Sequence, residues 1–328
     1  MKIIVDAFGG DNAPLEILKG SADAVRELDI DIMLTGREDE IRRVAKENGI
    51  SLERMEIADA PSVISMQDSP GEIMRSKKDC SMAVSGALVV GSSLIVKRIR
   101  GVSRIAFAPV IPNSESCFML IDCGANVDCK PEALQQFGIM GSIYMEKVMG
   151  FSNPRVSLAN IGTEDGKGNE LQREAFALLK ESGVNFVGNV EARDVPNDAG
   201  EVVVADGFTG NVILKMYEGV AILLLGKLKK VFLKNLRNKI AAALVLKDLK
   251  QFKKQYDYNE YGGAPLVGCS KPIFKAHGSS KERTFFNAVR LTKAYVEGHV
   301  TEEISSALKQ YREKKNLSMD DDEFGSED

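Results

Sequence analysis

Glycines and small polar residues follow an apolar run near the middle of the chain. Residues 201–219, EVVVADGFTGNVILKMYEG, contain a strand-like run ending at Asp206, then a short loop, then a segment with helical spacing. Glycine allows the backbone to approach a ligand closely, and a helix N-terminus directs N–H groups and its positive dipole end at the loop. Such loops are typical of anion sites, usually for phosphate. The candidate ligands here are Asp206, Gly207, Thr209, Gly210 and Asn211.

Other loops share this composition. Glycine, asparagine and isolated charges also follow apolar runs at residues 6–14, 124–130, 162–170 and 188–194. A plain strand–helix turn explains any one of them, but the recurrence favours one shared anion site. A Walker lysine pattern and a Gly-x-Gly-x-x-Gly pattern are both missing from the sequence, which disfavours a conventional nucleotide site. The further candidates for substrate binding are Gly9, Gly10, Asp11, Asn169, Asn189 and Arg193.

Three residues are candidates for catalysis. Lys167 lies between two glycines and can supply a mobile point charge. Arg193, a candidate for binding rather than catalysis, offers a planar fork for phosphate oxygens. Lys275 and His277 follow the apolar run Pro272-Ile-Phe274, and a histidine there can act as general acid or base. The alternative is a histidine that is only hydrogen-bonded in its loop. Because the sequence contains no Gly-x-Ser-x-Gly motif, direct attack by a bound nucleophile is favoured over an acyl-enzyme.

Alternating strand-like and helix-like segments must position these loops. Apolar β-rich runs alternating with helices predict an α/β fold of three layers, with a mostly parallel sheet covered on both faces. Ligands bind at the carboxyl ends of strands in such folds. The predicted strands are Lys2–Asp6, Asp31–Thr35, Arg54–Ala58, Arg104–Val110, Cys117–Cys123, Arg155–Ile161, Asn185–Val190 and Glu201–Ala205, and the predicted helices are Pro14–Leu28, Glu38–Asn48, Pro131–Met149 and Glu170–Ser182.

The composition is that of an ordinary soluble globular protein. The chain has 328 residues and a net charge of −4, so no global basic field recruits nucleic acid. We expect one large unit over residues 1–317, or two intimately packed lobes, and a disordered acidic tail over 318–328. The N-terminal run is a strand rather than a signal peptide, and no apolar run approaches the roughly 20 residues of a membrane span. A cytoplasmic location is expected, with reduced thiols because the five cysteines form no Cys-x-x-Cys pair.

A basic segment over residues 227–258 predicts a helical arm. Residues 227–254 contain ten Lys or Arg and one Asp, and Asn235 and Asn238 indicate a break between two helices. An apolar stretch lies at or just after that break. One interpretation is a helix packed in a dimer interface; the other is contact with an anionic membrane surface on the inner face of the cell membrane. Basic residues also suit an acidic carrier protein. The predicted contact residues are Ile240, Leu244, Val245 and Leu246.

Seven ordered motifs resemble one family. The motifs are VDAFGGDNAP at 5–14, DCGANVDCKPEAL at 122–134, NIGTEDGKGNEL at 160–171, FVGNVEARD at 186–194, VVVADGFTGNVILK at 202–215, YGGAPLVG at 261–268 and KAHGSS at 275–280. Through them the chain resembles the bacterial phosphate acyltransferase (PlsX) family from Met1 to about Val300. In one place it departs from the family pattern: a helix, a strand and a glycine-rich loop are missing between Val84 and Ser85.

The resemblance implies an activity and partners. It implies transfer of a long-chain fatty acyl group from acyl carrier protein to inorganic phosphate, giving acyl phosphate for phospholipid synthesis. It also implies a homodimer, a fold like that of the isocitrate dehydrogenase and phosphate acetyltransferase class, and no metal or cofactor. The alternative is a non-catalytic anion-binding or membrane-associated scaffold protein of the same fold.

Overall fold

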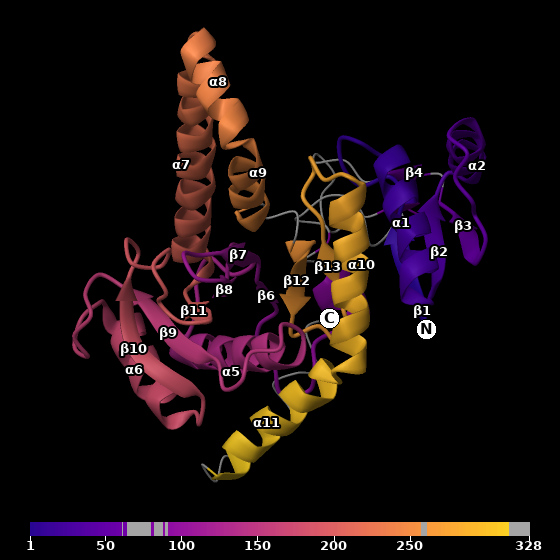
Figure 1. Cartoon of the computed structure of the whole chain (residues 1–328). Helices are drawn as coiled ribbons and strands as arrows, with labels where there is room; N and C mark the ends of the chain where they lie inside the picture. The colour runs from indigo at the N-terminus through magenta and orange to yellow at the C-terminus, as the bar shows by residue number, and fades with distance from the viewer. Residues whose placement is uncertain (61, 64–79, 82–87, 89–90, 257–260, 315–328) are drawn as a thin grey trace.

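The computed structural model describes residues 1–60, 62–63, 80–81, 88, 91–256 and 261–314. The junction between Val84 and Ser85, the acidic tail over 318–328 and the end of the predicted arm at 257–258 lie outside these residues. Figure 1 shows two bodies built around separate sheets, with a long helical arm projecting from one of them.

A five-stranded sheet in the order β10-β9-β11-β8-β7 forms one body. β8 (Cys117–Ile121), β9 (Arg155–Asn160), β10 (Asn185–Glu191) and β11 (Val202–Val204) are parallel, and β7 (Val110–Pro112) is antiparallel to β8 at the edge. The carboxyl ends of the four parallel strands therefore meet at one edge of the sheet. The loops predicted to bind anions after β8, β9, β10 and β11 all leave from this edge.

Helices cover both faces of this sheet. Val202 and Val204 point to the core shared with α5 (Pro131–Lys147) and α6 (Glu170–Glu181). Val203, between them, points to the opposite core, where Leu214 of α7 (Gly207–Leu233) packs. Successive side chains of a strand alternate between faces, so a run of three valines serves two cores. The prediction of a three-layer α/β fold is confirmed.

The second body contains the N-terminal sheet. β1 (Lys2–Asp6), β2 (Asp31–Gly36) and β3 (Met55–Asp59) are parallel, and α1 (Leu15–Leu28) and α2 (Glu38–Glu47) connect them. The helix α10 (Glu282–Glu297), from late in the chain, packs against α1, so segments far apart in the sequence meet in this body. Gly20 is the point of closest approach, because a Cβ there would lie 2.5 Å from the Glu282 carbonyl oxygen.

Short strands connect the two bodies. β12 (Ala264–Val267) pairs antiparallel with β6 (Ala106–Phe107) and with β13 (Phe274–Lys275). The single strand predicted over Arg104–Val110 is therefore wrong: its first part joins β12, and its last residue begins β7 and pairs with β8. The remaining elements are the pair β4 (Ser62–Val63) and β5 (Cys80–Ser81), the π-helix η1 (Ser92–Val96), and α11 (Val300–Lys314), which packs on α5.

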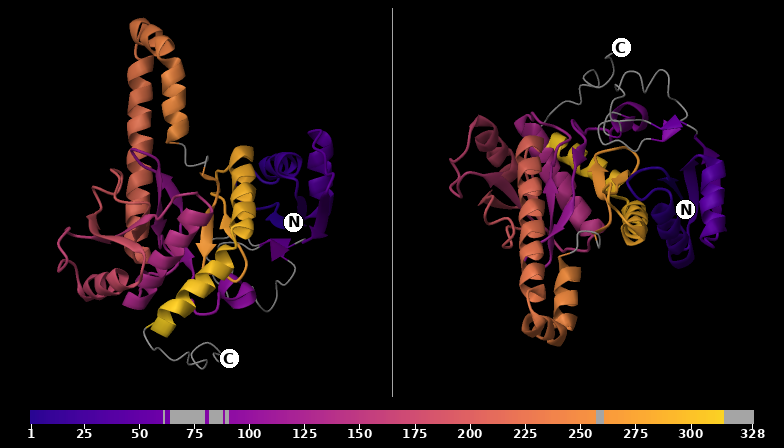
Figure 2. Two further views of the ribbon diagram at one scale, coloured as in Figure 1. Left: turned by 60° about the horizontal axis from the view of Figure 1, so that its bottom comes forward. Right: turned by 90° about the horizontal axis from the view of Figure 1, so that it is seen from above.

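The arm differs from its prediction. It begins as one 27-residue helix, α7, which starts at Gly207 within the fold rather than at Lys227. The chain reverses at Asn235, whose side chain caps α8 (Leu236–Leu244), and α9 (Leu246–Gln255) runs back toward the body (Figures 1 and 2). Asn238 lies inside α8 and is no second break. By length and composition α7 can cross a membrane, so the expectation that no run approaches this size is wrong.

Candidate active site

A buried carboxylate organises the loop after β8. The Asp122 side chain is fully buried. Its Oδ1 accepts hydrogen bonds from the backbone N–H of Phe107 (2.8 Å) and Ala125 (3.1 Å), and its Oδ2 accepts from the backbone (2.6 Å) and side-chain (2.9 Å) nitrogens of Asn126. Burial raises the pKa of Asp122, while these donors act to lower it. The carboxylate thus holds the β8 loop and β6 in one arrangement.

The first turn of α7 packs directly on this loop. The Gly207 N–H donates to the Asn126 carbonyl oxygen at 2.8 Å. A Cβ at Gly207 would lie 2.4 Å from that oxygen, and one at Gly210 would lie 1.9 Å from the Asp122 carbonyl oxygen. Both distances are too short for any side chain, so these glycines permit contact between helix and loop. Their assignment as phosphate ligands stays a prediction.

Asp206 caps α7. Its Oδ1 accepts from the backbone N–H of Thr209 at 2.9 Å, and its Oδ2 accepts from the Thr209 hydroxyl at 2.7 Å. The Gly210 N–H donates to the Asp206 carbonyl oxygen. Several donors that the sequence assigns to phosphate are therefore bonded within the protein in this structure. Asn211 lies next to the β8 loop, since a Cβ at Gly124 would be 3.7 Å from Asn211 Oδ1.

Lys275 brings a cation to β6, which Asp122 ties to the β8 loop. Its Nζ lies 5.5 Å from the centroid of the Phe107 ring, and the Phe107 N–H is the one that Asp122 binds. Burial, and then the charge of Lys215 on α7, lower the pKa of Lys275. Lys215 itself pairs with Glu218 at 2.9 Å.

Amide side chains connect β10 to the end of β9 and to the loop after it. The Asn160 side-chain nitrogen donates to Asn189 Oδ1 (3.1 Å) and to the Lys167 carbonyl oxygen (3.1 Å), and Asn189 donates to the Glu164 carbonyl oxygen (2.8 Å). Asn189 lies within β10 rather than in the predicted loop, and it acts within the protein by holding the loop after β9. Asn169 caps α6 by accepting from the Gln172 N–H at 3.3 Å.

The predicted cations of these loops have acidic neighbours. Lys167 Nζ lies 3.8 Å from Glu164 Oε1, and the exposed Arg193 pairs with Glu191 at 2.9 Å and Asp194 at 3.6 Å. An incoming phosphate must compete with these carboxylates. The ion pair of Lys167 is longer than that of Arg193 with Glu191, so a phosphate can displace the carboxylate from Lys167 more easily.

His277 belongs to a separate group of loops. Its Nδ1 lies 2.8 Å from Ser279 Oγ. The Asp11 N–H donates to the Gly278 carbonyl oxygen at 2.8 Å, and a Cβ at Gly10 would lie 2.8 Å from that oxygen. The residues predicted around Gly9–Asp11 therefore lie beside the loop that carries His277. Since Lys275 is two residues from His277, the segment 275–280 joins this group to the α7 group.

The sequence reasoning missed the supporting residues. Asp122, Asn126 and Asn160 are absent from the predicted site, although each lies at or just beyond the end of β8 or β9. Residues that follow apolar strands lie at the edge of the sheet where ligands bind, so this position in the sequence could have identified them. Their role as hydrogen-bond centres depends on partners far away in the sequence.

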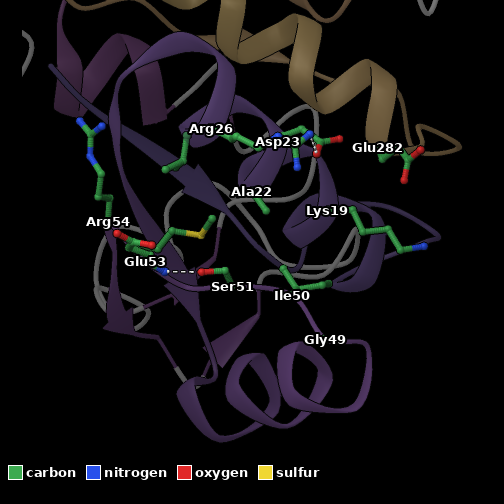
Figure 3. Close-up of a pocket in the computed structure, with 12 residues that line it drawn as sticks. Lys19, Ala22, Asp23, Arg26, Gly49, Ile50, Ser51, Glu53, Arg54 and Glu282 are labelled. Atoms are coloured by element: carbon green, nitrogen blue, oxygen red, sulfur yellow. Dashed lines mark hydrogen bonds and ion pairs between the residues drawn. The ribbon is translucent and has the colours of Figure 1, made fainter.

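The pocket in Figure 3 lies elsewhere, with a volume of about 580 Å³. It is lined by α1 and by residues 49–55, which lead into the amino end of β3. Its cations are paired with carboxylates: Arg26 with Asp23, and Arg54 with Asp29 and Asp31. It is therefore distinct from the edge where the predicted ligands gather.

Comparison with known proteins identifies the family. A family model described as "Fatty acid synthesis protein" matches residues 1–85 and 83–303. The phosphate acyltransferase of Alkaliphilus oremlandii is 44% identical and covers 99% of this chain and 100% of the relative, and that of Clostridioides difficile is 38% identical and covers 98% and 100%.

Solved structures of low identity share the fold. A phosphotransacetylase from Streptococcus pyogenes matches with a TM-score of 0.59 at 14% identity, over 90% of this chain and 94% of that one. The EutD phosphotransacetylase from Staphylococcus aureus matches with a TM-score of 0.56 at 15% identity, over 90% and 93%. From its near full-length identity to curated members, the chain belongs to the phosphate acyltransferase family of fatty acid synthesis proteins and is an acyltransferase.

Proposed function

We propose that this enzyme transfers a long-chain fatty acyl group from acyl carrier protein to inorganic phosphate, and that the acyl phosphate is used in phospholipid synthesis. The observation that carries the proposal is the position of Lys275 over Phe107 of β6, which Asp122 ties to the β8 loop on which the first turn of α7 rests. This arrangement combines fixed positive charge, a helix N-terminus and amide side chains at one edge of the sheet.

The proposed reaction is a direct displacement. A phosphate oxygen attacks the thioester carbonyl carbon, a C–O bond forms, and the C–S bond breaks with its electron pair leaving on sulfur. Phosphate is already a nucleophile at neutral pH, so the protein mainly positions it and offsets its charge. Asn211 and nearby loop donors stabilise the oxyanion formed at the carbonyl. Lys167 and Lys275 offset the phosphate charge, and His277 orients the substrate or donates a proton to the leaving thiolate.

Phosphate-dependent release of carrier-protein thiol tests the proposal. The enzyme is incubated with palmitoyl-acyl carrier protein at increasing phosphate concentration, and free thiol is measured. The proposal predicts a rate that saturates with phosphate and is much lower in Asn211→Ala. Thiol release that does not depend on phosphate, or no release at all, contradicts it. A non-catalytic scaffold, the alternative from the sequence, is set aside because the curated relatives are named as enzymes.

We propose that the exposed apolar face of α7 packs against a second copy of the chain in a homodimer. Val220, Leu224 and Val231 recur at helical spacing and are exposed on α7, although side chains of this size are usually buried. Beyond its first turns, which pack on the body, α7 projects outward as part of the arm with α8 and α9 (Figure 2). A second copy would remove this apolar surface from water.

We propose that the tip of the arm contacts the inner face of the cell membrane, and that the enzyme is otherwise cytoplasmic. Ile240, Leu244, Val245 and Leu246 are exposed around the turn between α8 and α9. Lysines flank them on both helices. Apolar side chains at a tip with surrounding cations suit shallow insertion into an anionic surface. Interfacial contact is favoured over a span for α7, because its start is part of the folded α/β body.

A further inference from the structure

Three exposed apolar side chains border the proposed anion site. Val127 follows β8, Ile161 follows β9, and Phe208 follows β11. Their exposures are 61%, 81% and 64%. We call Val127, Ile161 and Phe208 the apolar rim. The three side chains follow three adjacent strands of the sheet, and they are exposed to solvent instead of being packed in a hydrophobic core.

Strand register places the rim around the start of α7. Val204 of β11 pairs with Leu158 of β9, so the chain segments that lead to Phe208 and Ile161 leave adjacent strands. The first turn of α7 contacts the β8 loop through Gly207 and Gly210, and Phe208, which follows Gly207, is exposed. Val127 follows Asn126, whose carbonyl oxygen binds the Gly207 N–H.

The rim also adjoins a predicted phosphate ligand. A Cβ at Gly162 would lie 3.0 Å from Lys167 Cγ, so the stem of Lys167 passes over the residue next to Ile161. The stem of Lys167 therefore lies one residue away from Ile161 along the loop after β9. An anionic group and a hydrocarbon chain of one ligand could contact both at once.

We infer that the apolar rim binds the first methylenes of the acyl chain. This rests on the proposed function. In an acyl phosphate, and in the transition state that leads to it, a phosphate oxygen is bonded to the carbon that carries the chain. The chain must therefore leave the anion site within a few bond lengths, and the rim lies at that exit. Burying these methylenes against the rim stabilises substrates that carry them over an acetyl group, which lacks them.

Chain-length selectivity tests the inference. The ratio of kcat/KM for palmitoyl- over acetyl-acyl carrier protein is measured for wild type, Phe208→Ser, Ile161→Ser and the double variant, because an acetyl group lacks the first methylenes. We expect the ratio to fall roughly tenfold in the double variant. The matched control is Ile4→Ser, at 68% exposure on β1, which should keep the wild-type ratio. An unchanged ratio in an active double variant overturns the inference.

A binding measurement keeps the inference independent of turnover. Decylphosphonate and methylphosphonate are titrated into wild type and the double variant by calorimetry. We expect the double variant to lose the preference for the decyl compound and to keep its affinity for the methyl compound. If wild type shows no phosphate-dependent turnover, the proposed function fails, but the rim is still judged by this preference. Equal decyl preference in both proteins, or a double variant that dissociates from dimer to monomer, overturns it.

Discussion

Gly210 lies so close to Asp122 that a Cβ on the glycine would be 1.9 Å from the Asp122 carbonyl oxygen. The first turn of α7 and the loop after β8 are therefore in backbone contact. This contact fixes where the helix N-terminus points. It explains a glycine at this position by packing, whatever the ligand.

Gly210→Ala should displace α7 from the β8 loop. We expect a loss of at least about 2 kcal/mol in the free energy of unfolding, with a large fall in kcat/KM. Urea unfolding and steady-state kinetics measure the two effects. Gly219→Ala on the same helix is the matched control, because a Cβ there meets nothing within 4 Å. It should be neutral or stabilise by about 0.5–1 kcal/mol; equal behaviour of the two variants would refute the packing account.

Asp122→Asn should destabilise the protein although the side chains have nearly the same shape. Both oxygens of Asp122 accept from N–H donors, so the amide NH2 of asparagine must face a donor in either orientation. We expect a cost of about 3 kcal/mol in the free energy of unfolding. Glu115→Gln, on an exposed turn, is a control for loss of one carboxylate. A change below 1 kcal/mol in Asp122→Asn would contradict the role assigned to this carboxylate.

The pKa of Lys275 is lowered from the ordinary lysine value of 10.5. Phosphate affinity should therefore fall with rising pH, and the fall should occur at a pH below 10.5. The ammonium form binds phosphate, and it is lost as pH rises through this lowered value. Lys215→Gln removes one of the two causes, so the loss should move to higher pH. Burial, the larger cause, remains, and the shift should be partial. The measurement is the apparent KM for phosphate from neutral to alkaline pH, with Lys180→Gln as the control. The same pH profile in wild type, Lys215→Gln and Lys180→Gln would be inconsistent with a role for Lys275.

Lys167→Ala should raise the apparent KM for phosphate by about tenfold, since a charge-assisted contact is lost. Lys180→Ala, an exposed lysine on α6, is the control and should leave KM unchanged. Phosphate saturation curves at fixed acyl carrier protein measure both. An unchanged KM in Lys167→Ala removes that residue from phosphate binding.

Leu244→Glu should weaken binding to vesicles of phosphatidylglycerol, because it places a carboxylate at the exposed tip of the arm. Sedimentation with vesicles at low and high salt measures binding, which should also decrease with salt. Val187→Glu, at an exposed position of β10, is the matched control. Undiminished binding of Leu244→Glu argues against contact through the tip.

The sequence predicts local elements better than long-range pairings. The strand over Lys2–Asp6 and the helix over 131–147 follow from apolar periodicity within each segment. The division of 104–110 between two sheets depends on β12, some 160 residues away, and periodicity carries no such information. Likewise α7 extends through Gly219 and Gly226, where a change in composition suggested a separate arm.

The site shows the same limit. Loop composition predicted which edge of the sheet would carry glycines, amides and cations. It did not distinguish glycines needed for packing, such as Gly210, from glycines needed for a ligand. It also placed His277 and the loop around Gly10 in the same list as Asn211, whereas the structure divides them into two groups joined by residues 275–280.

Transfer of isotope from phosphate tests the central claim most directly. The enzyme is incubated with palmitoyl-acyl carrier protein and ¹⁸O-labelled phosphate, and the products are analysed by mass spectrometry. The account predicts palmitoyl phosphate that retains every labelled oxygen of the phosphate, formed in equal amount to free carrier-protein thiol. Unlabelled palmitate as the first product, with thiol released at the same rate without phosphate, would contradict it.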